Sequence, residues 1–445
     1  MSLSGLGKWS GREDLNLRPQ RPERCALPNC ATPRNFFIIV KLLLISKGKH
    51  LKYCVLIMDG SAGLPIPERG GKTSLELART PNLDALAVAG TVGLGRNVPP
   101  DLDPDSAVAC MSIFGYDPKV YYTGRAPIEA RSLGIDIKPG EVVFRCNPVT
   151  IQNGIMVSHS AGSISTEEGH LLMAGLNERI GSDKVHFFPG VSYRNILKLK
   201  EAEETALAFT TPPHDIPGKP ISGFLPSGKG SDRLLELMKR SENVFKDHPV
   251  NKKRIEQGKL PATGIWLFWG SAQMPVLPPF NELYGKRAAV TTGVDLLRGL
   301  GLLADMALLQ IPGVTDGPDN DYAAQAVGGL ESLADCDIVI IHIEAPDEAG
   351  HAGLVDKKIE AIEQIDAEVV SRIRHFSQDK IRLLVMSDHP TPVKQRVHTT
   401  DPVPLLLWGN GFKANGAQRF TEAEASKTGL HVDQGHKIMN TLIRG

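Results

Sequence analysis

Three short apolar runs, each followed by ionisable side chains, constrain the fold of this chain more than any other feature. They cover residues 53–58, 337–343 and 381–386. Their length, and the absence of polar alternation within them, are typical of strands that are buried on both faces of a parallel sheet. Amphipathic helical patterns lie between the runs, so the sequence predicts a layered α/β domain.

Acidic and histidine side chains follow each run within a few residues. They are Asp59 after the first run, Asp347 and His351 after the second, and Asp388 and His389 after the third. Because the ligands of open α/β sheets bind beyond the carboxyl ends of the strands, we expect these side chains to converge on one site.

The mixture of carboxylate and imidazole groups predicts two divalent metal sites. Asp347 and His351 are four residues apart, so a helical turn points both the same way, and His398 can complete a set of three ligands. The side chains that follow the other two runs make a second set. This chemistry favours Mn²⁺ or Zn²⁺ over Mg²⁺. A helix cap or a satisfied core histidine would explain one such pair, but explains the convergence of three strand ends less well.

Ser106 is the candidate nucleophile of a phosphoryl transfer. It follows Asp103-Pro104-Asp105 and precedes the apolar stretch 107–114, which places it near a helix amino terminus, where free amides favour an anionic phosphate. A metal-bound serine alkoxide would split the transfer into two manageable steps. By position alone a serine here is more commonly an N-cap, so that alternative stays open.

Helix signals and composition divide the chain into segments. One helix is expected to begin at Thr80-Pro81, with Thr80 as its cap, and to end at Gly90, and another covers residues 354–376. Residues 136–273 are polar and rich in turns, and the chain returns from them to the same sheet. We therefore expect a metal-binding core of residues 51–135 and 274–445, with an inserted domain at 136–273.

The first 50 residues differ from the rest, because Pro, Arg and Cys cluster between residues 16 and 34 without a helical or strand period. The stretch GREDLNLRPQRPERCALPNCATPR resembles a reading frame translated through a tRNA gene, and LKYCVLIMDG looks like the true start. The sequence thus predicts that residues 1–50 are a non-native or disordered extension.

Charge and composition argue against several classes of protein. Fifty basic residues balance fifty acidic ones without a long run of one sign, which argues against a nucleic-acid or membrane partner and favours a small substrate. The longest apolar run, residues 36–45, contains Lys41 and is about half the length that spans a bilayer. Six cysteines without CxxC spacing are typical of reduced thiols, so a cytoplasmic location is expected.

Longer motifs follow one another along residues 51–408. They are LIMDG, PDSAVACMSIFGYDP, YYTGRAPIEA, HSAGSISTEE, PGVSYR, TPPHDIPGKP, HPVNKKRIEQGKLPA, EAPDEAGH and SDHPTP. In this order they resemble the archaeal-type cofactor-independent phosphoglycerate mutases of the alkaline phosphatase superfamily.

The resemblance implies an alkaline-phosphatase-like layered α/β core that holds two divalent metals, with an inserted smaller α+β cap domain that closes over the substrate. The ligands it implies are Asp347, His351 and His398 for one metal, and Asp59, Ser106, Asp388 and His389 for the other. It also implies that the serine accepts the phosphoryl group of 3-phosphoglycerate and returns it to the other hydroxyl of the reoriented glycerate, without 2,3-bisphosphoglycerate.

Three residues of the matching motifs are candidates for binding the substrate, a small phosphorylated hydroxy acid. Arg125 and Arg194 suit the bidentate binding of carboxylate and phosphate, and His159 lies in the predicted insertion. For the two arginines, a surface ion pair is the alternative.

Several positions depart from the family pattern. Ala107 replaces an acidic residue, Ser163 replaces a histidine, Gln325 stands where lysine is common, and DGSAG replaces DGMAD. The segment GIWLFWGSAQMP is closer to a bacterial branch that has been proposed to phosphorylate homoserine. The alternatives are therefore a phosphotransferase acting on another small hydroxy acid such as homoserine, a metal-dependent phosphatase, and a catalytically silent metal-binding protein.

Overall fold

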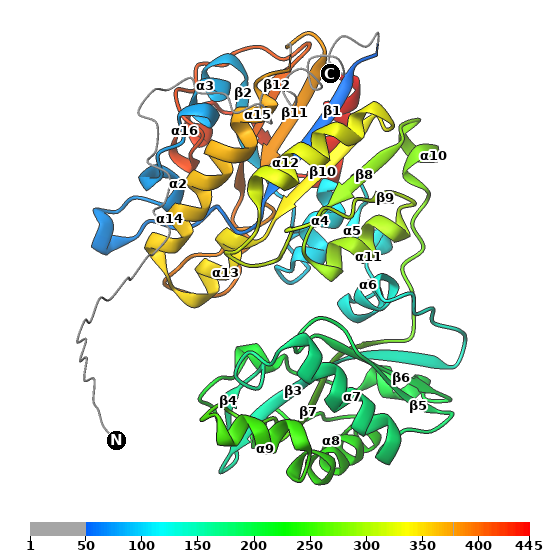
Figure 1. Cartoon of the computed structure of the whole chain (residues 1–445). Coiled ribbons are helices and arrows are strands. Elements are labelled where there is room, and N and C mark those ends of the chain that lie inside the picture. The colour runs from blue at the N-terminus through cyan, green and yellow to red at the C-terminus, as the bar shows by residue number, and fades with distance from the viewer. Residues whose placement is uncertain (1–49, 377) are drawn as a thin grey trace, which may run out of the picture.

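The computed structural model describes residues 50–376 and 378–445, so the predicted extension lies, apart from His50, outside the described residues. The strands of the larger sheet are β1 (Lys52–Met58), β2 (Thr91–Gly95), β8 (Ala288–Thr291), β9 (Ala307–Leu308), β10 (Ile338–Ile343), β11 (Ile381–Met386), β12 (Val403–Gly409) and β13 (His431–Val432). Those of the smaller sheet are β3 (Glu141–Gln152), β4 (Ile155–Ser158), β5 (Val185–Phe188), β6 (Asn195–Lys200) and β7 (Gly264–Ser271). Figure 1 shows the two sheets in separate parts of the molecule.

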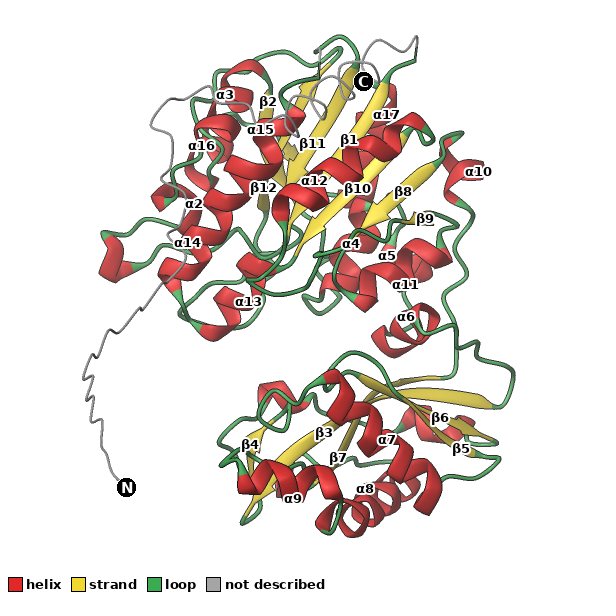
Figure 2. Cartoon of the chain, in the orientation of Figure 1, coloured by secondary structure: helices red, strands yellow, loops and turns green. Residues whose placement is uncertain are grey.

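Helices cover both sheets (Figure 2). Around the larger sheet they are α2 (Ser74–Leu77), α3 (Pro81–Ala89), α4 (Ser106–Ile113), α5 (Pro118–Tyr121), α6 (Arg125–Ser132), α10 (Phe280–Tyr284), α11 (Asp295–Leu303), α12 (Tyr322–Glu331), α13 (Ala345–Ala352), α14 (Val355–Gln364), the π-helix η6 (Ile365–Val370), α15 (Ser371–Ile373), α16 (Glu422–Lys427) and α17 (Ile438–Arg444). On the smaller sheet they are α7 (Thr166–Ile180), α8 (Ser231–Lys246) and α9 (Pro249–Glu256). Short 3₁₀ turns are η1 (Pro67–Arg69), η2 (Glu203–Leu207), η3 (Pro213–Asp215), η4 (Ile221–Gly223), η5 (Ser332–Ala334) and η7 (Gly435–Lys437).

The three predicted apolar runs form adjacent strands of the larger sheet, whose order is β13-β2-β12-β11-β1-β10-β8-β9. β1 pairs in parallel with β10 on one side and with β11 on the other. Along β1, Cys54 and Leu56 face one apolar core, and Val55 and Ile57 face the other. The prediction of an α/β fold with central parallel strands buried on both faces is therefore confirmed.

The predicted helix at residues 81–89 forms, but a distant side chain caps it. The side chain of Thr80 makes no capping hydrogen bond in the described structure. Instead Asp366 accepts hydrogen bonds from the amides of Leu83 at 2.7 Å and Asn82 at 3.2 Å. Thr80 occupies the N-cap position as predicted, but the prediction that its side chain caps the helix was wrong, because the free amides of the first turn donate to whichever acceptor lies close enough. Asp366 lies in η6, a π-helical turn within the helix expected at 354–376.

The smaller sheet is built around the long strand β3, which pairs antiparallel with β4, β6 and β7. All five strands lie within residues 141–271, inside the segment expected as an insertion, whose exact limits stay a prediction. Helix α6 lies at the junction of the two sheets: Ala126 and Ala130 pack with Val143 of β3 and Ile196 of β6. A buried ion pair between Glu129 of α6 and Arg145 of β3 reinforces this junction.

Two features bear on the expectations from composition. The four cysteines that the structure describes are Cys54, Cys110, Cys146 and Cys336, and each is buried with a free thiol. Among residues 50–376 and 378–445, there is no helix with both the length and the apolar character that crossing a membrane requires.

Gly299 lets α11 approach α6, and its replacement tests this packing. A Cβ atom at position 299 would lie 1.8 Å from the main-chain oxygen of Ile128, which cannot rotate away. We expect Gly299→Ala to lower the free energy of unfolding by about 1–3 kcal/mol through overpacking, although alanine is the better helix former by about 1 kcal/mol. The midpoint of urea unfolding measures the change.

The matched control for this substitution is Gly328→Ala in α12. There the added Cβ would meet Cδ1 and Cγ1 of Ile311 at 2.6 and 2.8 Å, and both are side-chain atoms that a change of rotamer can move aside. We therefore expect Gly328→Ala to lower the free energy of unfolding by less than Gly299→Ala does. Equal midpoints for the parent and Gly299→Ala would contradict the packing argument.

Candidate metal centre and active site

The predicted ligands lie together beyond the carboxyl ends of three adjacent strands. Asp59 directly follows β1, Asp347 and His351 lie in α13 just after β10, and Asp388 and His389 follow β11. His398 enters from the connection between β11 and β12. These side chains fall into two groups that could each hold a metal ion, Asp347-His351-His398 and Asp59-Asp388-His389.

In the first group, two imidazole nitrogens and a carboxylate point at one place. Nε2 of His351 lies 2.8 Å from Nε2 of His398, and these nitrogens lie 3.2 and 3.4 Å from the carboxylate oxygens of Asp347. The Nδ1 atoms lie 2.9 Å from the carbonyl of Arg396 and 3.0 Å from that of Pro104, and a carbonyl only accepts. Each Nδ1 therefore carries a proton, so a ring that has lost any second proton turns its Nε2 lone pair inward, where a cation could bind.

In the second group, a buried carboxylate has an unused oxygen. Nε2 of His389 lies 3.0 Å from Oδ2 of Asp388 and 4.0 Å from Oδ1 of Asp59. This Oδ1 has no hydrogen-bond partner among the described residues. Burial and the neighbouring charge of Asp388 raise the pKa of Asp59 well above its usual value. Since buried charges are normally paired or bound to a metal, this group also fits a divalent cation.

A stacked pair of histidine rings and a close backbone contact at Gly60 join the two groups. The rings of His389 and His398 stack with their centroids 3.7 Å apart. Gly60 donates its amide to Oδ1 of Asp388 at 3.0 Å. Its φ of +57° suits glycine, and a Cβ there would lie 2.5 Å from Oδ1 of Asp347. The glycine of the LIMDG motif is thus required for the carboxylates to approach one another.

Ser106 is the first residue of α4, and Asp105 is the N-cap of that helix. The side chain of Asp105 accepts a hydrogen bond from the amide of Ala107 at 2.6 Å. The interpretation of Ser106 as the cap is therefore wrong. Its hydroxyl oxygen instead lies 3.1 Å from Nε2 of His389, at the edge of the second group.

Arg125 lies beside the candidate nucleophile. Its guanidinium pairs with Asp105, the neighbour of Ser106, at 3.1 Å and with Glu129 at 2.8 Å. It also stacks over the ring of Trp269, at 4.7 Å from the centroid. Trp269 has a φ of +54°, and the pairing of its strand β7 with β3 shifts register nearby. A β-irregularity therefore turns this indole toward Arg125.

Arg194, just before β6, reaches the neighbour of Asp347, and His159, just after β4, packs its ring against Tyr193 with the centroids 5.5 Å apart. Arg194 pairs with Asp316 at 2.7 Å and with Glu348, the neighbour of Asp347, at 3.5 Å. Burial and the positive charges of Arg194 and His351 lower the pKa of His159.

Lys358 is a buried residue that the sequence reasoning missed. Its Nζ donates hydrogen bonds to the carbonyls of Ala62 at 3.0 Å and Thr391 at 2.7 Å, which ties the loop after β1 to the loop after β11. Burial lowers the pKa of Lys358 to about 8. The sequence does indicate that Lys358 is buried, because this lysine falls on the apolar face of its helix with Ile362 and Ile365, four and seven residues later.

Two of the departures from the family pattern, Gln325 and Ala107, lie at buried positions. Gln325 is buried and bonds the carbonyl of His342 at 2.9 Å and the side chain of Asn320 at 2.8 Å. Ala107 is fully buried in an apolar core. Ser163 is exposed, in a turn where its φ is +52°.

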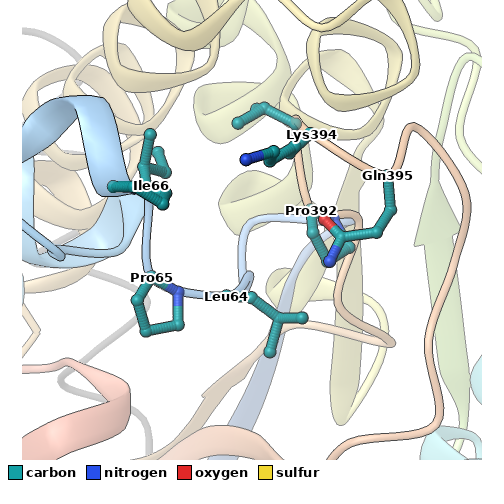
Figure 3. A pocket seen from close by; sticks show the side chains of 8 residues that line it. Leu64, Pro65, Ile66, Pro392, Lys394 and Gln395 are labelled. Atoms are coloured by element: carbon teal, nitrogen blue, oxygen red, sulfur yellow. The ribbon is translucent and has the colours of Figure 1, made fainter.

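An apolar pocket of about 460 Å³ lies between the loops after β1 and β11 (Figure 3). Its lining residues are Leu64, Pro65, Ile66, Pro67, Pro392, Val393, Lys394 and Gln395. This lining includes no acidic or histidine side chain and no predicted site residue. The pocket is therefore separate from the candidate metal centre.

Comparison with known proteins gives a consistent family. Residues 87–251 match the sequence profile described as 2,3-bisphosphoglycerate-independent phosphoglycerate mutase. A protein of that name from Methanothrix thermoacetophila is 45% identical over 398 residues, which cover 89% of this chain and all of the relative. A probable 2,3-bisphosphoglycerate-independent phosphoglycerate mutase from Geobacter sulfurreducens is 40% identical over 400 residues, covering 88% of this chain and 100% of the relative.

A solved structure of a Pyrococcus horikoshii protein also matches. The TM-score is 0.74 at 28% identity, and the match covers 89% of this chain and 97% of that one. The cofactor-independent phosphoglycerate mutase of Thermoplasma acidophilum matches with a TM-score of 0.56 at 26% identity, covering 88% and 99% of the two chains.

Metal binding at Asp347, His351 and His398 should depend on pH. In the metal-free protein burial opposes the charged ring of His351, but the carboxylate of Asp347 raises its pKa to about 9. A metal therefore displaces a proton at pH 7, and we expect its apparent affinity to rise about tenfold per pH unit up to pH 9 and then level off. Calorimetric titration of Mn²⁺ in buffers of different ionisation enthalpy measures the proton release. An affinity that does not change with pH would contradict the assignment.

Proposed function

The chain belongs to the 2,3-bisphosphoglycerate-independent phosphoglycerate mutase family, and on this premise we propose that it interconverts 3-phosphoglycerate and 2-phosphoglycerate. We further propose that Ser106 carries the phosphoryl group between the two hydroxyls, so that 2,3-bisphosphoglycerate is not needed. The observation that carries this proposal is the serine hydroxyl 3.1 Å from His389, beside two groups of metal-ligand type. A cytoplasmic location stays a prediction.

Two divalent ions are part of this proposal. Asp347, His351 and His398 would hold one ion, and Asp59, Ser106, Asp388 and His389 would hold the other. The unused Oδ1 of Asp59 and the inward Nε2 atoms support this assignment. Bound metals neutralise charge on a transferring phosphoryl group and lower the pKa of a coordinated hydroxyl. The imidazole content favours Mn²⁺ or Zn²⁺.

The protein's own groups would perform the transfer in two steps. In the first, the hydroxyl of Ser106 gives up its proton and Oγ forms a bond to phosphorus, while the bond from phosphorus to the substrate oxygen breaks and that oxygen takes up a proton. In the second, the other hydroxyl of the reoriented glycerate gives up its proton and takes the phosphoryl group, and Oγ of the serine takes up a proton as its bond to phosphorus breaks. The position of Ser106 at the start of α4 suits the phosphoserine, because helix amino termini favour anionic groups.

Arg125, Arg194 and His159 are the proposed substrate-binding residues. Arg125 pairs with Asp105, which precedes Ser106, and Arg194 pairs with Glu348, which follows Asp347. Each guanidinium therefore borders one of the two metal groups. The substrate carries a carboxylate and a phosphate, both of which arginine binds through paired hydrogen bonds. The ion pairs are compatible with this role, since acidic partners also hold a guanidinium in place before a substrate arrives.

Purified full-length protein with Mn²⁺ should interconvert the two phosphoglycerates without added 2,3-bisphosphoglycerate, as followed by ³¹P NMR. Ser106→Ala should abolish turnover while retaining Mn²⁺ binding, because other groups supply most of the ligands. The control is Ser371→Ala, whose hydroxyl bonds the Ala367 carbonyl within its own helix and which should stay active. Release of inorganic phosphate would indicate a phosphatase, phosphorylation of homoserine a kinase, and no turnover a silent metal-binding protein.

A pair of variants separates a substrate role of Arg194 from an ion pair. Arg194→Met should raise the KM for 3-phosphoglycerate by about 10–100-fold, since a charge-assisted hydrogen bond contributes about 1.5–3 kcal/mol. Asp316→Asn removes the ion pair at 2.7 Å but leaves the guanidinium, so its KM should stay near that of the parent. Equal changes of KM in the two variants would favour the purely structural ion pair.

A further inference from the structure

We propose that His342 is a positioning residue that fixes Asp59 with one oxygen free for the metal. His342 lies inside β10, in the apolar run IVIIHI, and both side chains are fully buried. Nε2 of His342 lies 2.7 Å from Oδ2 of Asp59, and Nδ1 lies 3.0 Å from the hydroxyl oxygen of Thr292. This inference rests on the proposed metal site of Asp59.

The two contacts of the ring define which nitrogen carries the proton. With a metal bound, Asp59 is ionised, and because an ionised carboxylate only accepts hydrogen bonds, Nε2 of His342 then donates to it. Nδ1 of the neutral ring is then an acceptor. Thr292 can donate to it, because the amide of Val294, at 3.0 Å, uses a lone pair of the same hydroxyl and not its proton.

This arrangement leaves the two oxygens of Asp59 with different roles. Oδ2 is held by His342, whereas Oδ1 has no hydrogen-bond partner among the described residues and lies 4.0 Å from Nε2 of His389. A carboxylate held by one oxygen cannot rotate freely about its Cβ–Cγ bond. His342 therefore presents Asp59 as a ligand through Oδ1 alone, as partners of metal ligands commonly do.

The neighbouring strand holds His342 in turn. Thr292 directly follows β8, which pairs with β10 in parallel. The side-chain amide of Gln325 donates to the carbonyl of His342 at 2.9 Å and to that of Thr291 at 3.4 Å. Because the ring and the main chain of His342 are both tied to the end of β8, the orientation of Asp59 is set across three adjacent strands.

Glu344 is the competing partner in this region. Its Oε2 lies 3.6 Å from Nε2 of His342, and Asp59, His342 and Glu344 could together surround a cation. The hydrogen bond of 2.7 Å between His342 and Asp59 already uses Nε2 of the ring and Oδ2 of the carboxylate, which favours the positioning role of His342 over metal ligation. Binding of a third Mn²⁺ by the parent protein, lost on substitution of His342, would overturn that role.

Two amide variants of His342 test the proposal in the full-length, metal-free protein. The longer Gln side chain can place its NH₂ where Nε2 lies and keep the donor to Asp59, whereas Asn reaches only the position of Nδ1. We expect His342→Asn to weaken one of two Mn²⁺ sites by about 10–100-fold, and His342→Gln to weaken it less. Calorimetric titration resolves the two Mn²⁺ sites, and the site formed by Asp347, His351 and His398 serves as the internal reference.

Two further measurements make every outcome decisive. Melting temperatures of the metal-free variants report any structural damage. If His342→Asn and His342→Gln lose Mn²⁺ affinity equally, and each loss is matched by a lower melting temperature, the proposal is overturned. Asp59→Asn tests the premise. If it leaves both Mn²⁺ sites intact, the proposed metal site itself is wrong; if it removes one site while both His342 variants bind as the parent does, only the positioning role is overturned.

Discussion

Buried carboxylates at the ends of adjacent parallel strands set the electrostatics on which the rest of this molecule depends. In the metal-free protein the two groups respond differently. Burial alone would raise the pKa of Asp347, but His351 and His398 hold it well below its usual value. Asp59 is buried beside Asp388 and Asp347, and its pKa is raised well above its usual value. The first group thus neutralises itself with a proton on imidazole, while the second depends on an added cation or on protons.

Such a cluster is stable only if the loops that carry it cannot spread apart. Parallel pairing fixes the starting point of each loop, since β11, β1 and β10 are neighbours in register. Beyond the strands, Lys358 bonds to carbonyls of two loops, and the hydroxyl of Thr391 donates to Asp347. Gly60 provides the space that a Cβ would take. Main-chain and side-chain contacts therefore oppose the repulsion between the carboxylates.

The sequence was sufficient to predict what depends on local pattern. The three central strands, the edge at which they meet and the side chains that follow them were read from apolar runs and their flanks. Contacts between distant segments could not be read in this way. Asp366 caps α3 from a segment far along the chain, and tertiary packing decides that this acceptor reaches the free amides. The cap of α4 is a local contact, and there the helix boundary lies one residue earlier than expected, so that Asp105 and not Ser106 is the cap. His342 and Lys358 stood out only as polar residues at apolar positions.

Asp105 connects the candidate nucleophile to the smaller sheet. It caps the helix that begins at Ser106 and pairs with Arg125, while Glu129 of α6 joins Arg125 to Arg145 of β3. Charges therefore alternate from the start of α4 to the smaller sheet, and a shift of that sheet would act on the backbone beside Ser106. Ala107 and Gln325 are buried in structural roles, so these departures leave this connection unchanged. Trp269 of the smaller sheet, held at a φ of +54°, stacks over the same guanidinium of Arg125, so the strained backbone of β7 is also coupled to the start of α4.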